Sequence, residues 1–469
     1  MWSPREGKTA TTDGYEVAPP QLAGPPTPRA GRSLFGFLDE LRDNALAIFG
    51  PEAFAELYIE SRFFWRRTLL VNDPAGIRHV LLDNAGNYTK TLITRELVEP
   101  GLGQGLLTSE GETWRRHRRI MAPAFDHRSI VGYAPIMTAI AEDFRDRWTA
   151  QPAGETLDVA REMMHATLLI IARTMFSSDS DAIVEIVEHA VGRYQNEIRP
   201  GLLDLLGLPD WVPRPGRRRR ADRALGAFNR EIERLIAERT RQGAAGPRDL
   251  LGRLLAARDE ETGSGMSRRE IRDQVVTIFM AGHETTALAL TWTWYLLALH
   301  PAAEARLHGE LAAVLGGRAP GHDDLAKLPY TRMVIEEAMR LYPPAHTISR
   351  EATDADSVGG HRIAPGTVIL IAPWVVHRHR RLWETPERFD PERFAPARSA
   401  ARPRYAYLPF GAGPRICIGA AFAMAEAMLV LATLAQRCRL RLAAGHRVEP
   451  QGLITLRPRT GMTMTVEPR

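Results

Sequence analysis

The stretch FGAGPRICIG, residues 410–419, says most about this chain, because it carries Cys417 on a glycine-rich loop. A predicted helix over residues 420–436 follows at once. The glycines allow the backbone to approach a flat ligand closely. A cysteine at the start of a helix lies in positive potential beside free amides, which lowers its pKa and favours the thiolate. Arg415, two residues before the cysteine, offers a positive charge to an anionic group.

The composition narrows what this cysteine can do. The chain has 469 residues, of which 44% are hydrophobic and 25% charged, as in an ordinary globular protein. Its two cysteines, Cys417 and Cys438, exclude a disulfide scaffold, a four-thiolate zinc site and a cysteine-held iron–sulfur cluster. No C-x-x-C-H motif is possible, so covalent c-type haem attachment is excluded as well. We expect Cys438 to be a buried, inert cysteine on a later helical face.

A long helix is predicted from Ser267 to His300, with no proline before Pro301. Ser267 and Glu270 have the spacing of a capping box. At ~1.5 Å per residue the helix would be roughly 50 Å long, and its apolar circumference predicts burial. Within it, the stretch AGHETT (281–286) places polar residues where burial is costly. From the residues alone, a hydroxyl bonded back to its own helix with a glutamate in a salt bridge is as reasonable as a ligand site.

At these residues the chain resembles the cytochrome P450 family. The cysteine loop matches F-x-x-G-x-x-x-C-x-G at every fixed position, and residues 281–286 match A-G-x-[DE]-T-T. Glu337 and Arg340 match E-x-x-R, FDPERF (389–394) matches the meander, and WRRHR (114–118) matches W-x-x-x-R. The motifs occur in the family's order, and the helix and strand pattern extends the resemblance over about residues 35–469.

The resemblance implies a mainly α fold, the cytochrome P450 fold. We expect a single large helical domain, with small β-sheets at one edge and a haem between the long central helix and the cysteine loop. The domain would cover residues 33–469 and follow a disordered tail, 1–32. Helical periodicity is clear over 131–148, 157–176, 181–198 and 221–241, and strand-like patterns occur at 63–71, 360–376 and 448–468.

The resemblance also assigns roles to individual residues. Cys417 would be the metal ligand, the axial thiolate of haem b, and Thr285 and Glu284 would be catalytic, relaying protons to dioxygen. Arg393 of the meander would complete a structural network with Glu337 and Arg340. His346 and His117 are weaker candidates for propionate binding. The other residues expected to bind the haem are Arg415, Trp114, Arg118, Arg350, Phe410, Gly411, Gly419 and Ala281.

The activity implied is that of a monooxygenase that inserts one atom of O2 into an apolar substrate, such as a fatty acid or terpene. The expected substrate-contacting segments lie around 89–107, 278–281, 345–348 and 453–454. In the last three the side chains are largely aliphatic, with no acid or base except His346. No flavin or ferredoxin domain is fused before Arg469, so electrons would come from a separate ferredoxin and its NAD(P)H-dependent reductase, docking near Arg115, Arg116 and Arg119. The alternatives are a haem-thiolate peroxygenase or isomerase and, more remotely, a haem-based sensor or carrier.

The remaining predictions concern location and charge. The net charge is +5. The basic run 217–220 lies between a proline-rich stretch and a helix-like stretch, and no aromatic residues are interleaved with its arginines. We therefore predict a solvated helix start and no nucleic-acid partner. No signal peptide and no membrane anchor is recognisable, and at most one cysteine pair could form, so the expected location is the cytoplasm.

Overall fold

The structure is a computed structural model in which a long central helix organises the rest of the chain. It describes residues 21–24, 34–63, 66–152, 154–177, 184–187, 190, 217–243, 246–247 and 249–469. Most of the predicted helix over 181–198 and most of the expected tail lie outside these residues. Within the tail, Ala23 donates its amide to Tyr295 Oη over 3.0 Å and accepts from Tyr342 Oη over 2.8 Å.

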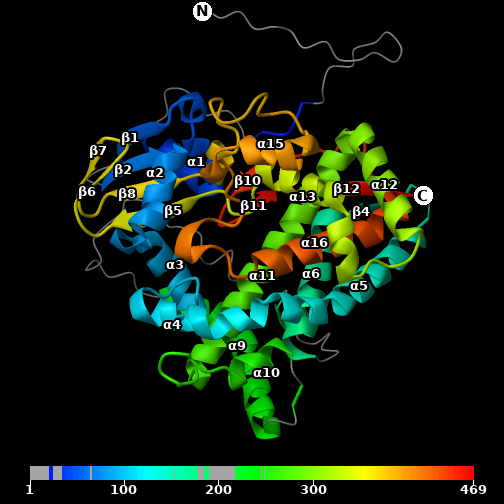
Figure 1. The fold of residues 1–469 in the computed structure, drawn as a ribbon, viewed down its shortest axis with the longest axis horizontal. Coiled ribbons are helices and arrows are strands. Elements are labelled where there is room, and N and C mark those ends of the chain that lie inside the picture. The colour runs from blue at the N-terminus through cyan, green and yellow to red at the C-terminus, as the bar shows by residue number, and fades with distance from the viewer. Residues whose placement is uncertain are drawn as a thin grey trace, which may run out of the picture.

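The central helix is α11 (Arg268–Leu299), and it runs through the middle of the molecule (Figure 1). Its predicted capping box is confirmed, because Ser267 Oγ accepts from the Glu270 amide and Glu270 accepts from the Ser267 amide. The helix packs chiefly against α6 (Val159–Phe176) and α13 (Pro329–Leu341), and also against α9 (Arg217–Gln242) and α16 (Ala420–Ala435). Neighbours on several sides explain why it is apolar nearly all round.

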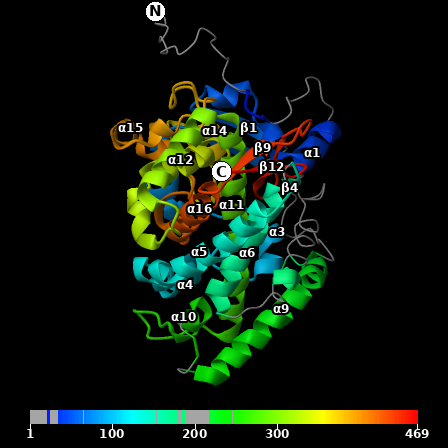
Figure 2. The same cartoon turned by 90° about the vertical axis from the view of Figure 1, so that its right-hand side faces the viewer.

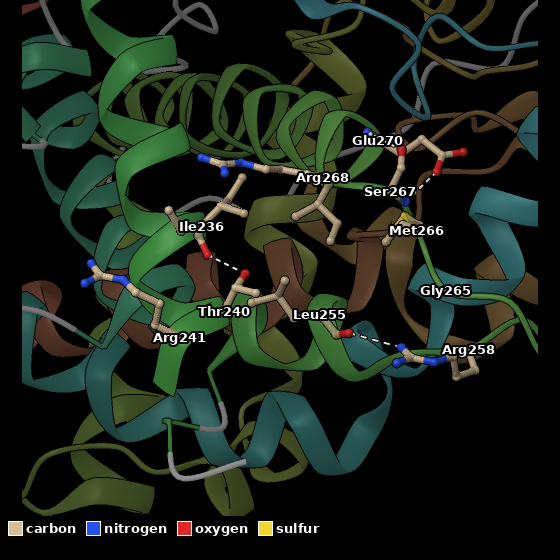
Figure 3. Close-up of a pocket in the computed structure, with 12 residues that line it drawn as sticks. Ile236, Thr240, Arg241, Leu255, Arg258, Gly265, Met266, Ser267, Arg268 and Glu270 are labelled. Atoms are coloured by element: carbon tan, nitrogen blue, oxygen red, sulfur yellow. Dashed lines mark hydrogen bonds between the residues drawn. The ribbon is translucent and has the colours of Figure 1, made fainter. Parts of the chain in front are cut away.

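The other helices surround this centre. Figure 2 shows α9 along the lower side of the molecule, below α6. Together with α10 and the first turn of α11, α9 lines a pocket, drawn in Figure 3. Over the residues that the structure describes, the remaining α-helices are α1 (Leu34–Asp43), α2 (Pro74–Arg78), α3 (Leu92–Leu102), α4 (Gly111–Met121), α5 (His127–Thr149), α10 (Leu250–Ala256), α12 (Pro301–Leu315), α14 (Pro373–Val376) and α15 (Pro396–Ala401).

The largest sheet lies to one side of the helical body (Figure 1) and has the strand order β1-β2-β8-β5-β3. Only β2 and β8 are parallel, whereas the other neighbours are antiparallel. The smaller sheets are β4-β12-β9, β10-β11 and β6-β7. The strands are β1 (Tyr58–Phe63), β2 (Arg66–Val71), β3 (Tyr88–Thr89), β4 (Thr156–Asp158), β5 (Ile348–Ala352), β6 (Asp356–Val358), β7 (His361–Ile363), β8 (Val368–Ile371), β9 (Cys438–Leu442), β10 (Pro450–Gly452), β11 (Leu456–Pro458) and β12 (Thr463–Pro468).

Two local predictions are wrong. Cys438 is buried, as expected, but it begins strand β9 rather than lying on a helix, because α16 ends at Ala435 and the chain pairs with β12. The strand-like region 360–376 ends in a short helix, α14, since Pro373 at its first position favours helical backbone and cannot donate to a sheet. Among the described residues, no helix is long and apolar enough to cross a membrane.

Candidate active site

The middle of α11 brings Glu284 and Thr285 to the core, and both local contacts considered from the sequence are present. Thr285 Oγ1 donates to Ala281 O over 2.9 Å. Glu284 is buried, with 4% of the residue exposed, and its Oε1 accepts from Thr455 Oγ1 at 2.7 Å and from Arg457 Nη2 at 2.9 Å. Ala281, however, is exposed although the same helix is mostly buried. Thr285 is partly exposed one turn further along the helix, so this face of α11 borders open space.

Cys417 lies on the loop before α16, and this loop closes through the Cys417 amide, which donates to Phe410 O over 2.9 Å. Phe410 is partly buried against the main core. Gly411 and Gly413 have φ angles of +72° and +69°, a region that favours glycine. A Cβ on Gly413 would lie 1.7 Å from Leu81 O, so the loop packs directly on the backbone of the residues around Leu81.

The thiol of Cys417 has accessible surface, yet protein surrounds it closely enough for burial to raise its pKa. The amide of Gly419 and the guanidinium of Arg118 oppose this rise. The prediction that the helix start lowers the pKa is therefore wrong for the free thiol, because desolvation is the largest contribution. A bound metal ion deprotonates a coordinating thiol outright, so this direction does not conflict with a thiolate ligand.

Three cations converge beside the loop. Arg415 is paired with Glu110 and lies over the Trp114 ring, with Cζ 4.3 Å from the ring centroid. Burial, with repulsion from Arg415, lowers the pKa of Arg350 to about 10 and that of Lys90 to about 7. Lys90 Nζ donates to Ser109 O over 2.8 Å and lies 4.0 Å from Glu110 Oε1.

This cluster has an excess of positive charge for its degree of burial. Glu110 is the carboxylate that contacts it among the residues the structure describes, against three basic side chains. Buried charges are normally paired, so the donor set fits an anionic ligand such as the propionates of the haem that the resemblance implies. Lys90 was missed in the sequence, since a single lysine after a two-residue strand carries no motif. What identifies Lys90 as part of the cluster is its distance from Glu110, which is twenty residues later in the chain and close only in the folded protein.

Arg118 contacts the cysteine loop itself, because its Nη1 donates to Ile416 O over 2.9 Å. In this structure it therefore holds the cysteine loop. The two histidines suggested as propionate partners are buried and engaged elsewhere. His117 contacts Glu270 Oε1 at 3.1 Å and Gln274 at 3.0 Å, and His346 Nε2 contacts Leu453 O at 2.8 Å.

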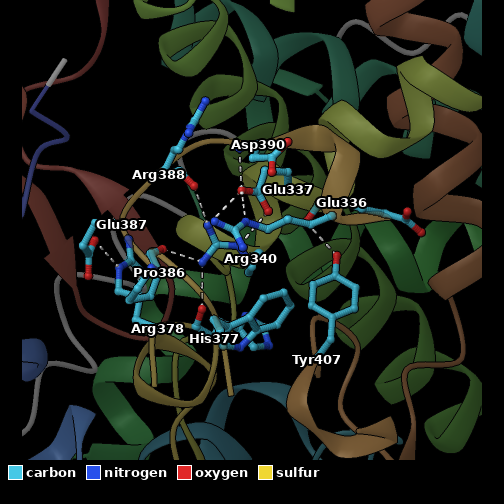
Figure 4. A network of polar contacts seen from close by, with 12 residues as sticks. Glu336, Glu337, Arg340, His377, Arg378, Pro386, Glu387, Arg388, Asp390 and Tyr407 are labelled. Carbon is cyan, nitrogen blue, oxygen red and sulfur yellow. Dashed lines mark hydrogen bonds and ion pairs between the residues drawn. The ribbon is translucent and has the colours of Figure 1, made fainter. Parts of the chain in front are cut away.

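The predicted network of Glu337, Arg340 and Arg393 is formed, and Figure 4 shows its Glu337–Arg340 pair. Arg340 Nε donates to Glu337 Oε2 over 2.6 Å, and Arg393 Nε lies 3.4 Å from Glu337 Oε1. The remaining nitrogens of Arg340 donate to the backbone oxygens of His377, Pro386 and Arg388. Glu337 and Arg340 have fully buried side chains, so the network ties α13 to the segment that leads to the cysteine loop.

The basic run on α4 was expected to dock an electron donor, but two of the three arginines concerned form ion pairs with other segments of the chain. Arg116 Nη1 lies 2.7 Å from Glu270 Oε1, and Arg119 Nε lies 2.8 Å from Asp259 Oδ1. Both arginines are thus paired within the chain, which reduces the outward-facing charge. Arg115, with an exposed side chain, pairs with the equally solvent-facing Glu112.

Comparison with known proteins gives a consistent result. The family model described as "Cytochrome P450" matches residues 55–463. The chain is 41% identical over 406 residues to cyclooctatin synthase of Streptomyces melanosporofaciens, covering 85% of this chain and 86% of that one. It is 37% identical over 388 residues to pentalenene oxygenase of Streptomyces avermitilis, covering 82% and 84%. A solved structure, the crystal structure of cytochrome P450DA heme domain, superposes with a TM-score of 0.82 at 27% identity, covering 96% of this chain and 99% of that one.

Proposed function

The chain belongs to the cytochrome P450 family, and from this premise we propose that it oxygenates a terpene-like hydrocarbon. The chain is a P450 monooxygenase by its family and by relatives named as oxygenases. What supports the substrate class is the pair of relatives named cyclooctatin synthase and pentalenene oxygenase. Leu107 and Ile454, in two of the expected substrate segments, are 46% and 54% exposed, so they offer aliphatic contact to an apolar molecule.

In this proposal Cys417 would hold the family's haem, which we propose to be haem b, as its iron ligand. Lys90, Arg350 and Arg415, the last of which lies over the Trp114 ring, would neutralise the propionates. When bound, the haem supplies the iron centre at which dioxygen is reduced and one oxygen atom is transferred. Gly411, Gly419 and Ala281 offer small surfaces beside this group, and Phe410 and Arg118 hold the cysteine loop in shape.

The protein's own contribution to the chemistry is the control of protons. Thr285 Oγ1 donates to Ala281 O, which leaves the hydroxyl oxygen free to accept a hydrogen bond from a water in the open space beside α11. Glu284 is held by Thr455 and Arg457, which connect it to the C-terminal hairpin β10-β11. A proton would pass from the carboxyl of Glu284 to that water, and the water, held by Thr285 Oγ1, would release one of its own protons toward the dioxygen.

We also propose that a separate ferredoxin and its NAD(P)H-dependent reductase supply the electrons. Because Arg116 and Arg119 are paired within the chain, Arg115 is the member of this run left most open to an acidic donor. Charge-steered docking predicts that reduction slows steeply as salt rises from 50 to 500 mM, while substrate affinity is unchanged. Salt-independent reduction would count against this mode of docking.

The substrate proposal is tested by a screen of terpenes, steroids and fatty acids for low-to-high-spin shifts of the purified haem protein. Cyclic terpene hydrocarbons are expected to bind most tightly and to be oxygenated when NAD(P)H, ferredoxin and reductase are added. The reduced, CO-bound spectrum tests the iron ligand, with Cys417→His as the comparison. A preference for fatty acids would overturn the proposed substrate class. An imidazole-type spectrum in the unmodified protein would overturn Cys417 as the iron ligand. Turnover that needs only peroxide would favour the alternative function, a peroxygenase.

A further inference from the structure

A pocket lies between α9, α10 and the start of α11, and Cys417 is not among the residues that line it (Figure 3). Its volume is about 780 Å³, within the range of small-molecule sites. Its accessible apolar surface comes from Leu255 and Met266, which are partly buried, while Ile236 and Ile271 in the same lining are buried. An apolar surface of this kind favours an occupant with an apolar body over a purely ionic one.

Three arginines, Arg241, Arg258 and Arg268, also line this pocket and are exposed. In Figure 3 they surround the apolar side chains. Arg258 Nη1 donates to the carbonyls that end α10, the nearest at 2.9 Å, and Arg268 Nη2 donates to Glu233 O over 3.0 Å. These contacts fix two guanidinium groups without neutralising them.

The carboxylate that lines the pocket is already in use. Glu270 Oε1 accepts from Arg116 at 2.7 Å and contacts His117 at 3.1 Å, and Oε2 accepts from the Ser267 amide at 2.7 Å. Over the part of the chain that the structure describes, none of the three pocket arginines forms an ion pair with an acidic side chain. The pocket therefore combines an apolar interior with uncompensated positive charge.

We propose that this arginine-rimmed pocket binds an amphipathic carboxylate, with its chain on the apolar side chains and its carboxylate on the arginine rim. Arginine is suited to this role because its planar fork pairs with both oxygens of a carboxylate. A medium-chain fatty acid has the required chemistry. An acidic protein surface would satisfy the arginines but leave the apolar interior unfilled.

The pocket is separate from the proposed substrate site. Ala281 lies ten residues beyond Ile271 on the same helix, which is about 15 Å at ~1.5 Å per residue. The pocket nevertheless touches the capping box of α11 and, through Glu270, the helix α4 that carries Trp114. Binding in this pocket requires no turnover and is independent of which substrate is oxygenated.

The test measures binding of dodecanoate to the haem-loaded protein by isothermal titration calorimetry, with saturating imidazole present to occupy the iron. One saturable site is expected, with 1-dodecanol binding at least tenfold more weakly because it lacks the charge. The double variant Arg241→Ala/Arg268→Ala should weaken dodecanoate at least tenfold, and Met266→Asp should also weaken it by placing a negative charge on the apolar surface. Arg234→Ala on the same helix is the matched control, since Arg234 is paired with Glu231 and Glu238.

The stability of each variant is measured alongside its affinity for dodecanoate. Because the two substituted arginines are exposed, an unchanged thermal midpoint is expected and is checked for every variant. Equal affinity for dodecanol, an unchanged Kd in the double variant, or an equal loss in Arg234→Ala would overturn the proposal. Binding that disappears in the presence of imidazole would place the fatty acid at the haem and would also overturn it.

Discussion

Replacing Arg457 by methionine removes the guanidinium that donates to Glu284 Oε1 over 2.9 Å while keeping a side chain of similar length. The Glu284 side chain is 6% exposed and that of Arg457 is 27% exposed. Two unit charges about 4 Å apart attract by about 4 kcal/mol at an effective dielectric constant of ~20. Because Arg457 is partly solvated, screening and desolvation offset roughly half of this, which leaves a coupling of about 2 kcal/mol.

A double-mutant cycle measures this coupling. The free energy of unfolding by urea would be determined for the unmodified protein, Arg457→Met, Glu284→Gln and the double variant. The coupling energy between the two positions is expected to be about 2 kcal/mol, so the double variant should be more stable than the sum of the single losses predicts. A matched control cycle combines Arg459→Met with Glu284→Gln. Because Arg459 pairs with Asp43 and Glu449, this cycle should show no coupling between the two positions.

The same variants test the role of Glu284 in the reaction. If Arg457 positions the carboxyl for proton delivery, Arg457→Met lowers the fraction of NAD(P)H consumed that appears as oxygenated product, and it does so without weakening substrate binding. A coupling energy below about 0.5 kcal/mol would show that the contact contributes little and would refute the energetic reasoning. A normal product yield in Arg457→Met and in Glu284→Gln would refute the proposed proton path.

Thr285→Ala should continue to consume NAD(P)H while releasing hydrogen peroxide in place of most of the product, whereas Thr285→Ser should retain product formation; normal product yield in the alanine variant would contradict the assignment. Lys90 has its pKa lowered to about 7 by burial. Between pH 7 and 10 the unfolded chain therefore binds more protons at this lysine than the folded chain does. The free energy of unfolding of the haem-free protein should rise by up to about 2 kcal/mol from pH 7 to 9, and Lys90→Met should abolish this rise. An equal rise in the variant would exclude this lysine as its source. Gly413→Ala should destabilise the protein by more than about 2 kcal/mol, because its Cβ would meet Leu81 O, while Gly445→Ala, with a positive φ but open space, should cost only about 1 kcal/mol; equal losses in urea unfolding would show that backbone strain alone is responsible.

Much of the helical frame was predictable because its signals are local. The capping box at Ser267 and Glu270, the long helix that follows it and the pairing of Glu337 with Arg340 all depend on residues within a few positions of each other. Strand boundaries were less predictable. Cys438 belongs to β9 because β12, more than twenty residues later, pairs with it, and no local pattern contains that partner.

In the candidate site, too, the local positions of the residues were predictable and their surroundings were not. The motifs placed Cys417, Thr285 and Glu284 on the correct elements, but they did not reveal what surrounds each side chain. The partners of Glu284 come from Thr455 and Arg457, about 170 residues away along the chain. Likewise, the direction in which the pKa of Cys417 shifts depends on burial, which the helix-dipole argument from the sequence left out.

The sequence by itself determined the family, the cysteine loop and the central helix, because these are carried by short motifs whose spacing is preserved in the chain. Only the tertiary structure decided that Lys90 joins Arg350 and Arg415, that Arg116 and Arg119 are paired inward, and that three arginines surround a separate apolar pocket. The physical reason is that desolvation and charge compensation depend on which distant segments pack together, and a linear pattern does not contain those distances.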